Sequence, residues 1–448
     1  MKTLARPATY FILTVVFILS FMGCSKTPQE EGPIAITNAV IIDGNGGQPI
    51  EGGTVVIEED KIQAVGSSNS VEIPPNAKII DATGKSVTPG LADMHVHLVG
   101  GWDGVSTDIL GYQRYLNSLL YCGVTTVMDV GNFLPFSLQI RDEILAGRIP
   151  GPRIYTSGPL IDGPNPYWPD ISFTVTSPEQ IPRFVKKLKN QGVDFLKAYA
   201  DLTYEQLIEI VKEGKKVGLQ VVCHHPHRLS NEELVDSGVA ASAHTFTKDI
   251  SLELISKMKE NAFAVITTLA VFEVFSLERF NDKSFLNHSL VQDTTPPWFL
   301  EKIVALEPKE PRPTEQFKNA QANTKQMFDA GVHIVGGTDA PYPGVFQGEG
   351  IHRELELLVE AGLTPLQAIT VVTKNAAILM QAEHEWGTIT QGKKADLLII
   401  NGRPDQNISE SRNVETVIQM GKILDRESLK FDVNKDPGFR ISSSIDSK

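Results

Sequence analysis

The sequence predicts an α/β fold, a (β/α)8 TIM-type barrel with a small discontinuous β-sandwich domain built from both chain ends. Two observations lead to this prediction. Residues 87–385 alternate short apolar runs with amphipathic segments, which is typical of repeated strand–helix units. Residues 33–86 and 386–430 are instead rich in short apolar runs bounded by turn residues. A chain of 448 residues is long enough for a barrel and a smaller second domain.

Eight apolar runs in the middle of the chain are the expected barrel strands. The first is a buried strand that begins near Pro89. The others are residues 124–129, 153–157, 194–199, 219–224, 240–244, 262–268 and 333–339. Helical segments separate most of them, for example residues 203–217 and 231–237. Eight such units favour a barrel, in which the functional side chains come from the carboxyl ends of the strands.

Two of the helical segments begin with a capping signature. Thr203 with Gln206, and Ser230 with Glu233, have the spacing in which two side chains satisfy the first backbone N–H groups of a helix. We therefore expect helices to begin directly after Thr203 and Ser230.

The two ends of the chain carry the same strand-rich pattern. Apolar runs at residues 34–43, 53–59 and 62–65 have counterparts at 395–400 and 414–424. The simplest packing brings both ends together as one domain beside the barrel. Residues 431–448 are a C-terminal tail in this prediction.

The first residues are typical of a targeting segment. Lys2 and Arg6 precede an uncharged apolar run at residues 10–22, which is too short to span a bilayer. Residues 1–23 are therefore predicted to be a signal peptide and residues 24–32 a polar tether.

The end of this segment, Gly23–Cys24, resembles a bacterial lipobox, although Phe21 and Met22 depart from the usual pattern. It predicts lipidation of Cys24 and an extracytoplasmic protein anchored to a bacterial membrane, in the periplasm or on the cell surface. A plain signal peptide that is cleaved nearby is the alternative.

Charge and cysteine content exclude some classes of partner and site. The formal net charge of −13 argues against nucleic acid or an anionic membrane surface as a partner. The charge says nothing about the small-molecule substrate that we expect. Cys122 and Cys223 lie on different expected strands without zinc-ribbon spacing, so they form no disulfide framework.

Metal-ligating side chains cluster at the expected strand ends. His95 and His97 are two residues apart at the end of the first strand, and alternate strand residues point to the same face. Two imidazoles on one face can bind one metal ion. Further candidates stand at four other strand ends: Lys197, His224, His244 and Asp339. Packing alone is a poor explanation for six such side chains at one end of a barrel.

The chain resembles the metal-dependent amidohydrolase superfamily over essentially all residues after the N-terminal segment. It is most similar to the subgroup that includes prolidase-like and imidazolonepropionase-related enzymes. The resemblance is carried by residues 89–97, 123–129, 194–199, 222–224, 242–244, 337–340, 352–358 and 392–398.

This resemblance implies an enzyme with two divalent metal ions, with zinc as the first choice and manganese, iron or cobalt as alternatives. It assigns His95 and His97 to the more buried metal, His224 and His244 to the second, carboxylated Lys197 to the bridge, and Asp339 to the first metal and to general base catalysis.

The chemistry of these side chains agrees with those roles. A lysine ammonium cannot ligate a cation, so Lys197 must lose a proton and take up carbon dioxide to become a carboxylate-like bridge. A snorkelling or salt-bridged lysine is the alternative, and it would leave a single metal, as in some deaminases of the family. Asp339 can accept a proton from water and pass it to a leaving nitrogen.

We therefore expect a hydrolase that cleaves an amide-type C–N bond in a dipeptide, an N-acyl amino acid or a cyclic amide. A deaminase or a hydrolase of esters, lactones or phosphotriesters on the same scaffold is one alternative. A non-catalytic surface binding protein is the other.

Several further residues receive provisional interpretations. Tyr199 shares a strand face with Lys197 and either contacts substrate or packs. Residues 270–313 form a long connection that is either a lid or a scaffold excursion. The remaining polar residues near the motifs are expected not to be ligands. His225 should point away from His224, and His227 lies on the loop. His352 is expected to be a helix-capping or surface residue, with an indirect contact to the site as the alternative, and Glu354 and Glu356 are given no chemical role.

Overall fold

The structure is a computed structural model, and it describes residues 32–104, 106–305 and 312–436. The predicted signal peptide, Cys24 and nearly all of the tether lie outside the described residues, as does the tail after residue 436. Predictions for those segments stay predictions.

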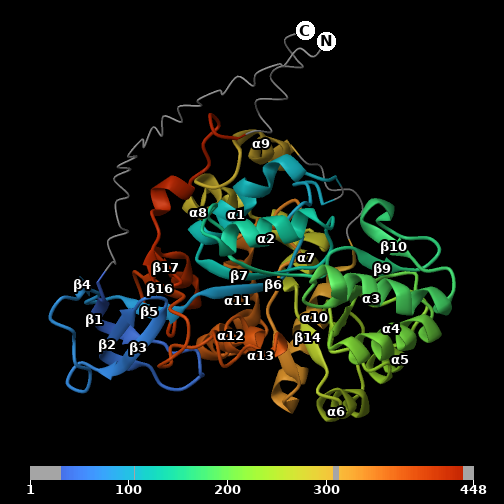
Figure 1. Ribbon diagram of the computed structural model, residues 1–448, viewed down its shortest axis with the longest axis horizontal. Coiled ribbons are helices and arrows are strands. Elements are labelled where there is room, and N and C mark those ends of the chain that lie inside the picture. Colours follow the sequence, from blue (N-terminus) through green and yellow to red (C-terminus); the bar gives the residue numbers. More distant parts are fainter. Residues whose placement is uncertain (1–31, 105, 306–311, 437–448) are drawn as a thin grey trace, which may run out of the picture.

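Both ends of the chain contribute to one eight-stranded sheet, as the sequence pattern suggested. Figure 1 shows these strands side by side, blue from the first part of the chain and red from the last. The path is β18-β17-β16-β5-β1-β2-β3, with β4 on β1, and the link between the two ends is the antiparallel pair of β16 and β5. The strands are β1 Ile34–Ile41, β2 Ile50–Glu58, β3 Lys61–Ser67, β4 Lys78–Asp81, β5 Ser86–Pro89, β16 Leu397–Ile400, β17 Val414–Gln419 and β18 Lys422–Ile423.

The middle of the chain forms two parallel sheets. One has the order β6-β7-β8 and the other β10-β9-β11-β12-β13-β14-β15. Backbone hydrogen bonds join both edge strands of the three-stranded sheet to the larger sheet, from Met94 N to Gly336 O (3.1 Å) and from Asp194 N to Thr156 O (2.9 Å). The strands are β6 Leu91–Val96, β7 Val124–Asp129, β8 Arg153–Thr156, β9 Leu160–Asp162, β10 Ser172–Thr174, β11 Leu196–Ala198, β12 Val221–Cys223, β13 Ala241–Ser242, β14 Ala264–Ile266 and β15 His333–Val335.

Each expected strand run of the middle segment contains a strand, with one correction at the first. The run near Pro89 is two strands, because β5 ends at Pro89 in the eight-stranded sheet and β6 begins at Leu91 in a parallel sheet. Gly90 separates them, where a Cβ atom would lie 2.1 Å from Thr125 Oγ1. The chain passes so close to β7 that only glycine fits there.

Helices cover the parallel sheets, and the two predicted capping boxes are confirmed. Thr203 caps α4 with Gln206, and Ser230 caps α5 with Glu233. The helices are α1 Tyr112–Tyr121, α2 Phe136–Leu145, α3 Ile181–Gln191, α4 Tyr204–Val217, α5 Asn231–Asp236, α6 Leu252–Glu260, α10 Thr314–Ala330, α11 Glu349–Glu360, α12 Pro365–Val371 and α13 Lys374–Leu379. Short 3-10 turns are η1 Ile109–Gly111, η2 Pro169–Ile171, η3 Pro178–Gln180, η6 Ile408–Arg412 and η7 Arg426–Leu429.

The long connection after β14 is helical where it is described. Its buried Arg279 pairs with Glu349 of α11 at 2.9 Å, and a cluster that includes Leu286 and Val291 packs around Phe346. These contacts anchor this part of the connection to the loop before α11 and to α11 itself. Its elements are α7 Leu269–Phe275, η4 Glu278–Phe280, η5 Lys283–Asn287, α8 Ser289–Gln292 and α9 Pro297–Ala305.

Among the described residues, none of the helices combines the length and apolar character that a membrane crossing requires.

Candidate metal centre

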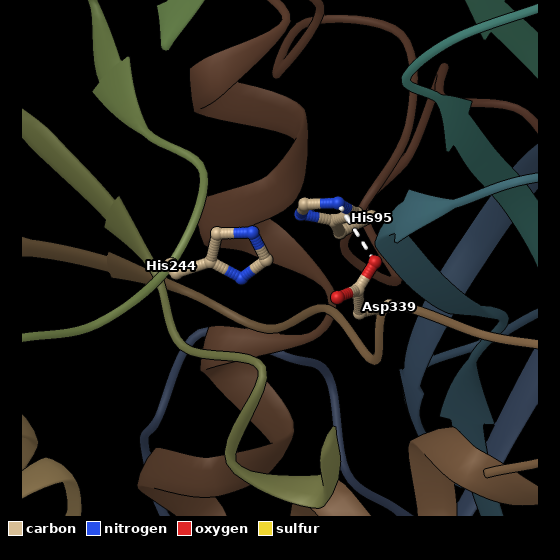
Figure 2. A group of neighbouring side chains, drawn as sticks. All are labelled: His95, His244 and Asp339. Carbon is tan, nitrogen blue, oxygen red and sulfur yellow. Dashed lines mark ion pairs between the residues drawn. The ribbon is translucent and has the colours of Figure 1, made fainter. Parts of the chain in front are cut away.

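The predicted site residues come together at the carboxyl ends of the parallel strands. His95 belongs to β6 and Lys197 to β11, while the other four follow their strands within a few residues. Figure 2 shows His95, His244 and Asp339 converging from three separate segments. Donor atoms of these three side chains lie within 4.8 Å of one another. This arrangement is what a metal ion requires, since its ligands must converge on one point.

Asp339 contacts both His95 in β6 and His97, the residue that follows β6. Its Oδ1 atom lies 3.2 Å from His95 Nε2, the contact dashed in Figure 2, and 3.1 Å from His97 Nε2. Both imidazoles therefore face the same side of the strand end, as their spacing predicted.

The other two histidines form a second group beside the first. His244 Nε2 lies 3.1 Å from His224 Nδ1, and the rings of His95 and His244 are 4.6 Å apart. His244 is thus adjacent to both groups.

The protonation states suit metal binding. Burial, partly opposed by Asp339, lowers the pKa of His95 to about 4, and burial together with the charge of Lys197 lowers that of His224 to about 3. The pKa of His244 is also held well below its usual range, chiefly by burial. These histidines are therefore neutral near pH 7, and neutral imidazole is the form that binds metal.

The carboxylate of Asp339 is ionised because of its neighbours, and despite its burial. Burial by itself raises the pKa of Asp339, but the adjacent His95 and His97 outweigh it and hold that pKa well below its usual range. A carboxylate anion beside neutral imidazoles is a donor set that fits a divalent cation.

Lys197 has an unusual environment for a lysine. It is 1 % exposed, and its Nζ atom has no hydrogen-bond partner among the residues that the structure describes. Burial lowers its pKa to about 8, partly opposed by the charge of Asp339. An unpaired buried ammonium is costly, so a larger fraction of Lys197 is the neutral amine than for an exposed lysine. The salt-bridged alternative has no support in this geometry.

The backbone that carries Asp339 is held in a rare conformation. Its φ angle is +64°, in the left-handed region that most residues avoid. At Gly337 a Cβ atom would lie 2.9 Å from His95 N, so the β15 end can approach β6 only without a side chain there. This close approach brings Asp339 within reach of His95 and His97.

Asp93 locks the same two strand ends together. Its carboxylate accepts hydrogen bonds from His95 N (3.3 Å), Thr338 N (3.0 Å) and Thr338 Oγ1 (2.6 Å). It is completely buried. Asp93 was not among the predicted site residues, although its position two residues before His95 on the same strand could have indicated it.

Hydrogen bonds at the Nδ1 atoms of His95 and His244 hold these two imidazole rings in place. His95 Nδ1 lies 2.8 Å from Ala243 O, and His244 Nδ1 lies 2.9 Å from Thr268 Oγ1. Such bonds set the ring orientation and leave Nε2 for a metal. Thr268 was also missed, because nothing in the sequence links it to His244.

Tyr199 lies beside the histidines. Its ring is 4.7 Å from that of His224, and its hydroxyl accepts a hydrogen bond from Trp168 Nε1 at 3.1 Å. On the other side, the ring of Phe272 is 6.2 Å from that of His244. Aromatic side chains thus flank the second pair of histidines.

The other histidines have separate contacts, and one interpretation needs correction. His225 Nε2 lies 2.9 Å from Leu229 O. His352 is neither a cap nor a surface residue, because it is fully buried and contacts Cys122 O (2.8 Å) and Ser411 Oγ (3.0 Å). It ties α11 to the end of α1 and to η6.

Known proteins share this chain's sequence pattern and its fold. Imidazolonepropionase from Brevibacillus brevis is 25 % identical over 425 residues, which cover 84 % of this chain and 90 % of that protein. A putative prolidase from Bifidobacterium longum superposes with a TM-score of 0.72 and 26 % identity, covering 89 % of this chain and 98 % of the other. A Xaa-Pro dipeptidase structure with bound methionine has a TM-score of 0.71 and 23 % identity, covering 88 % of this chain and 100 % of the other.

The sequence profile of the Amidohydrolase family matches residues 86–424, which include every residue of the centre described above. The match extends over most of the chain, from the last strand of the N-terminal segment to the final hairpin. This chain belongs to the Amidohydrolase family and is an enzyme of the hydrolase class.

Proposed function

We propose that this enzyme hydrolyses an amide-type C–N bond in a dipeptide, an N-acyl amino acid or a cyclic amide, with water activated by two divalent metal ions. The observation that carries the proposal is the convergence of neutral imidazoles and an ionised carboxylate, together with a buried lysine amine that has no hydrogen-bond partner among the described residues. The imidazolonepropionase and prolidase names of similar proteins support a C–N bond as the target.

The residues present fit the two metals. His95, His97 and Asp339 would hold the first, and His224 and His244 the second. Lys197 would bridge them after its neutral amine adds carbon dioxide, which forms an N–C bond and releases one proton. Zinc is the first choice, with manganese, iron or cobalt as alternatives.

When bound, the metals lower the pKa of water and polarise the scissile carbonyl group. The remaining chemistry belongs to Asp339. Its carboxylate accepts the proton that water loses on attack, and then gives that proton to the leaving nitrogen. His95 and His97 contact the same carboxylate oxygen and keep it oriented toward the centre.

The scaffold and the surroundings of the site support this proposal. We infer that the two parallel sheets close into one barrel, since backbone bonds join both edge strands of the smaller sheet to the larger one. Tyr199 and Phe272 would offer an apolar wall for the substrate, and the part of the connection at residues 273–305 would cover it. The strand-rich chain ends would form the accompanying β-sandwich domain.

Elemental analysis followed by a substrate panel tests the function. The purified enzyme should contain zinc or a similar metal, and should hydrolyse apolar dipeptides or N-acyl amino acids faster than lactones, phosphotriesters or aminopurines. Preference for an ester, or release of ammonia from an aminopurine, would contradict the amide assignment. A protein with no metal and no activity on any of them would instead support a surface binding role.

We also propose that Cys24 carries a lipid that anchors the enzyme to a bacterial membrane, on the extracytoplasmic side. The support is the basic start, the short apolar run and Gly23–Cys24 in the sequence. Cys24→Ser should move the enzyme from the membrane fraction to the soluble fraction, as followed by immunoblotting. Cys122→Ser is the matched control, because Cys122 is a buried residue of the folded part. Unchanged membrane partitioning of Cys24→Ser would refute the anchor.

A further inference from the structure

Glu354 is a completely buried carboxylate on α11 that has no part in the chemistry proposed above. One of its oxygens accepts hydrogen bonds from Thr267 Oγ1 and from Leu269 N (2.9 Å). The other accepts a bond from Ala270 N at 2.8 Å. These three donors lie on both sides of Thr268. Glu354 therefore holds the whole turn that joins β14 to α7.

Thr268, at the centre of that turn, has a strained backbone. Its φ angle is +47°, which is a rare conformation for a β-branched residue. Such a conformation persists only where the surroundings enforce it, and it is often found at functional sites. The three bonds to Glu354 provide that enforcement.

The strained turn aims the Thr268 hydroxyl at the candidate centre. Thr268 Oγ1 lies 2.9 Å from His244 Nδ1. If this nitrogen carries the proton and donates it to the hydroxyl, Nε2 keeps its lone pair on the side of His224 and His95. This bond is the contact that the structure gives to His244 Nδ1, so the conformation of the turn sets the position of the hydroxyl that meets this nitrogen.

We propose that Glu354 is a positioning residue for His244, and that it acts through the backbone conformation of Thr268. The inference rests on the proposed function, because it requires His244 to bind metal. The competing view is purely structural: Leu269 and Ala270 are the first residues of α7, so Glu354 would only cap that helix. The two views differ in what happens to metal affinity.

The test uses the metal-free full chain and measures zinc affinity in chelator-buffered titrations, together with thermal unfolding. Thr268→Val removes the hydroxyl while keeping the shape, and should weaken zinc binding by about 10- to 100-fold, the usual cost of losing such a contact. Glu354→Gln should weaken it in the same range. Thr268→Ser should restore the affinity.

Thr245→Val is the matched control, since Thr245 is buried next to His244 but its hydroxyl bonds to Thr324 Oγ1 at 3.1 Å. It should bind zinc as the wild type does. The double variant of Thr268→Val with Glu354→Gln should lose little more affinity than either single variant, because both would break the same route.

Three results would overturn the positioning role alone. They are wild-type zinc affinity in Thr268→Val, losses that add fully in the double variant, and a Glu354→Gln variant that unfolds at lower temperature with unchanged affinity. A wild-type protein that binds no zinc or other divalent metal would overturn the proposed function as well.

Discussion

Asp339→Asn should lower kcat by at least about 100-fold while the fold stays intact and some metal remains bound. The amide keeps the shape of the side chain and one oxygen that can face the metal. It cannot accept a proton as the carboxylate does, so both proton transfers of the proposed reaction lose their carrier. The measurement is kcat on the best substrate of the panel, with metal content determined on the same sample.

Asp194→Asn is the control for this variant. Asp194 lies just before β11, away from the strand ends that carry the centre, and its carboxylate accepts bonds from Arg141 and Thr156 N. Its replacement should reduce stability and leave kcat close to the wild-type value. If Asp339→Asn keeps a near-normal kcat with a full metal content, the proton carrier is another group, and the role proposed for Asp339 is wrong.

The sequence predicted which side chains come together better than the details of the scaffold, for a physical reason. Strands and their ends are local features, so the spacing of His95 and His97 was enough to place both imidazoles on one side. The division between β5 and β6 was missed because an apolar run does not reveal where a chain leaves one sheet for another. β9 and β10 were missed because they follow β8 with no α-helix between them, so they do not fit an alternation of strands and helices.

The supporting contacts of the centre depend on tertiary structure and could not be read from the chain. Glu354 lies 87 residues from Thr267, and no local pattern connects them. His352 was expected near a surface because it stands close to the start of a helix, yet its partners come from α1 and η6. The sides on which α11 is buried depend on the elements packed around it, and the periodicity of its own sequence does not reveal them.

Lys197→Ala should lower the metal content and abolish turnover, because it removes the bridge between the two metals. Short-chain carboxylates added to this variant should partly restore activity, since their oxygens can occupy the space of the lost carboxylated amine. Preparation of the wild type without carbon dioxide should likewise lower its metal content, and bicarbonate should restore it. Elemental analysis and kcat measure both effects.

Two further substitutions at Lys197 distinguish a role as the bridge between the metals from a role as a buried positive charge. Lys197→Arg keeps a positive charge but cannot form the carboxylated group, and Lys197→Met fills the buried space without any charge. If Lys197 acts through its charge, the arginine variant should stay active. If it acts as the bridge, both variants should be inactive and low in metal, as expected for an amine that is buried without a partner and has a pKa lowered to about 8. One tightly bound metal in the wild type, together with an active Lys197→Ala variant, would refute the two-metal centre.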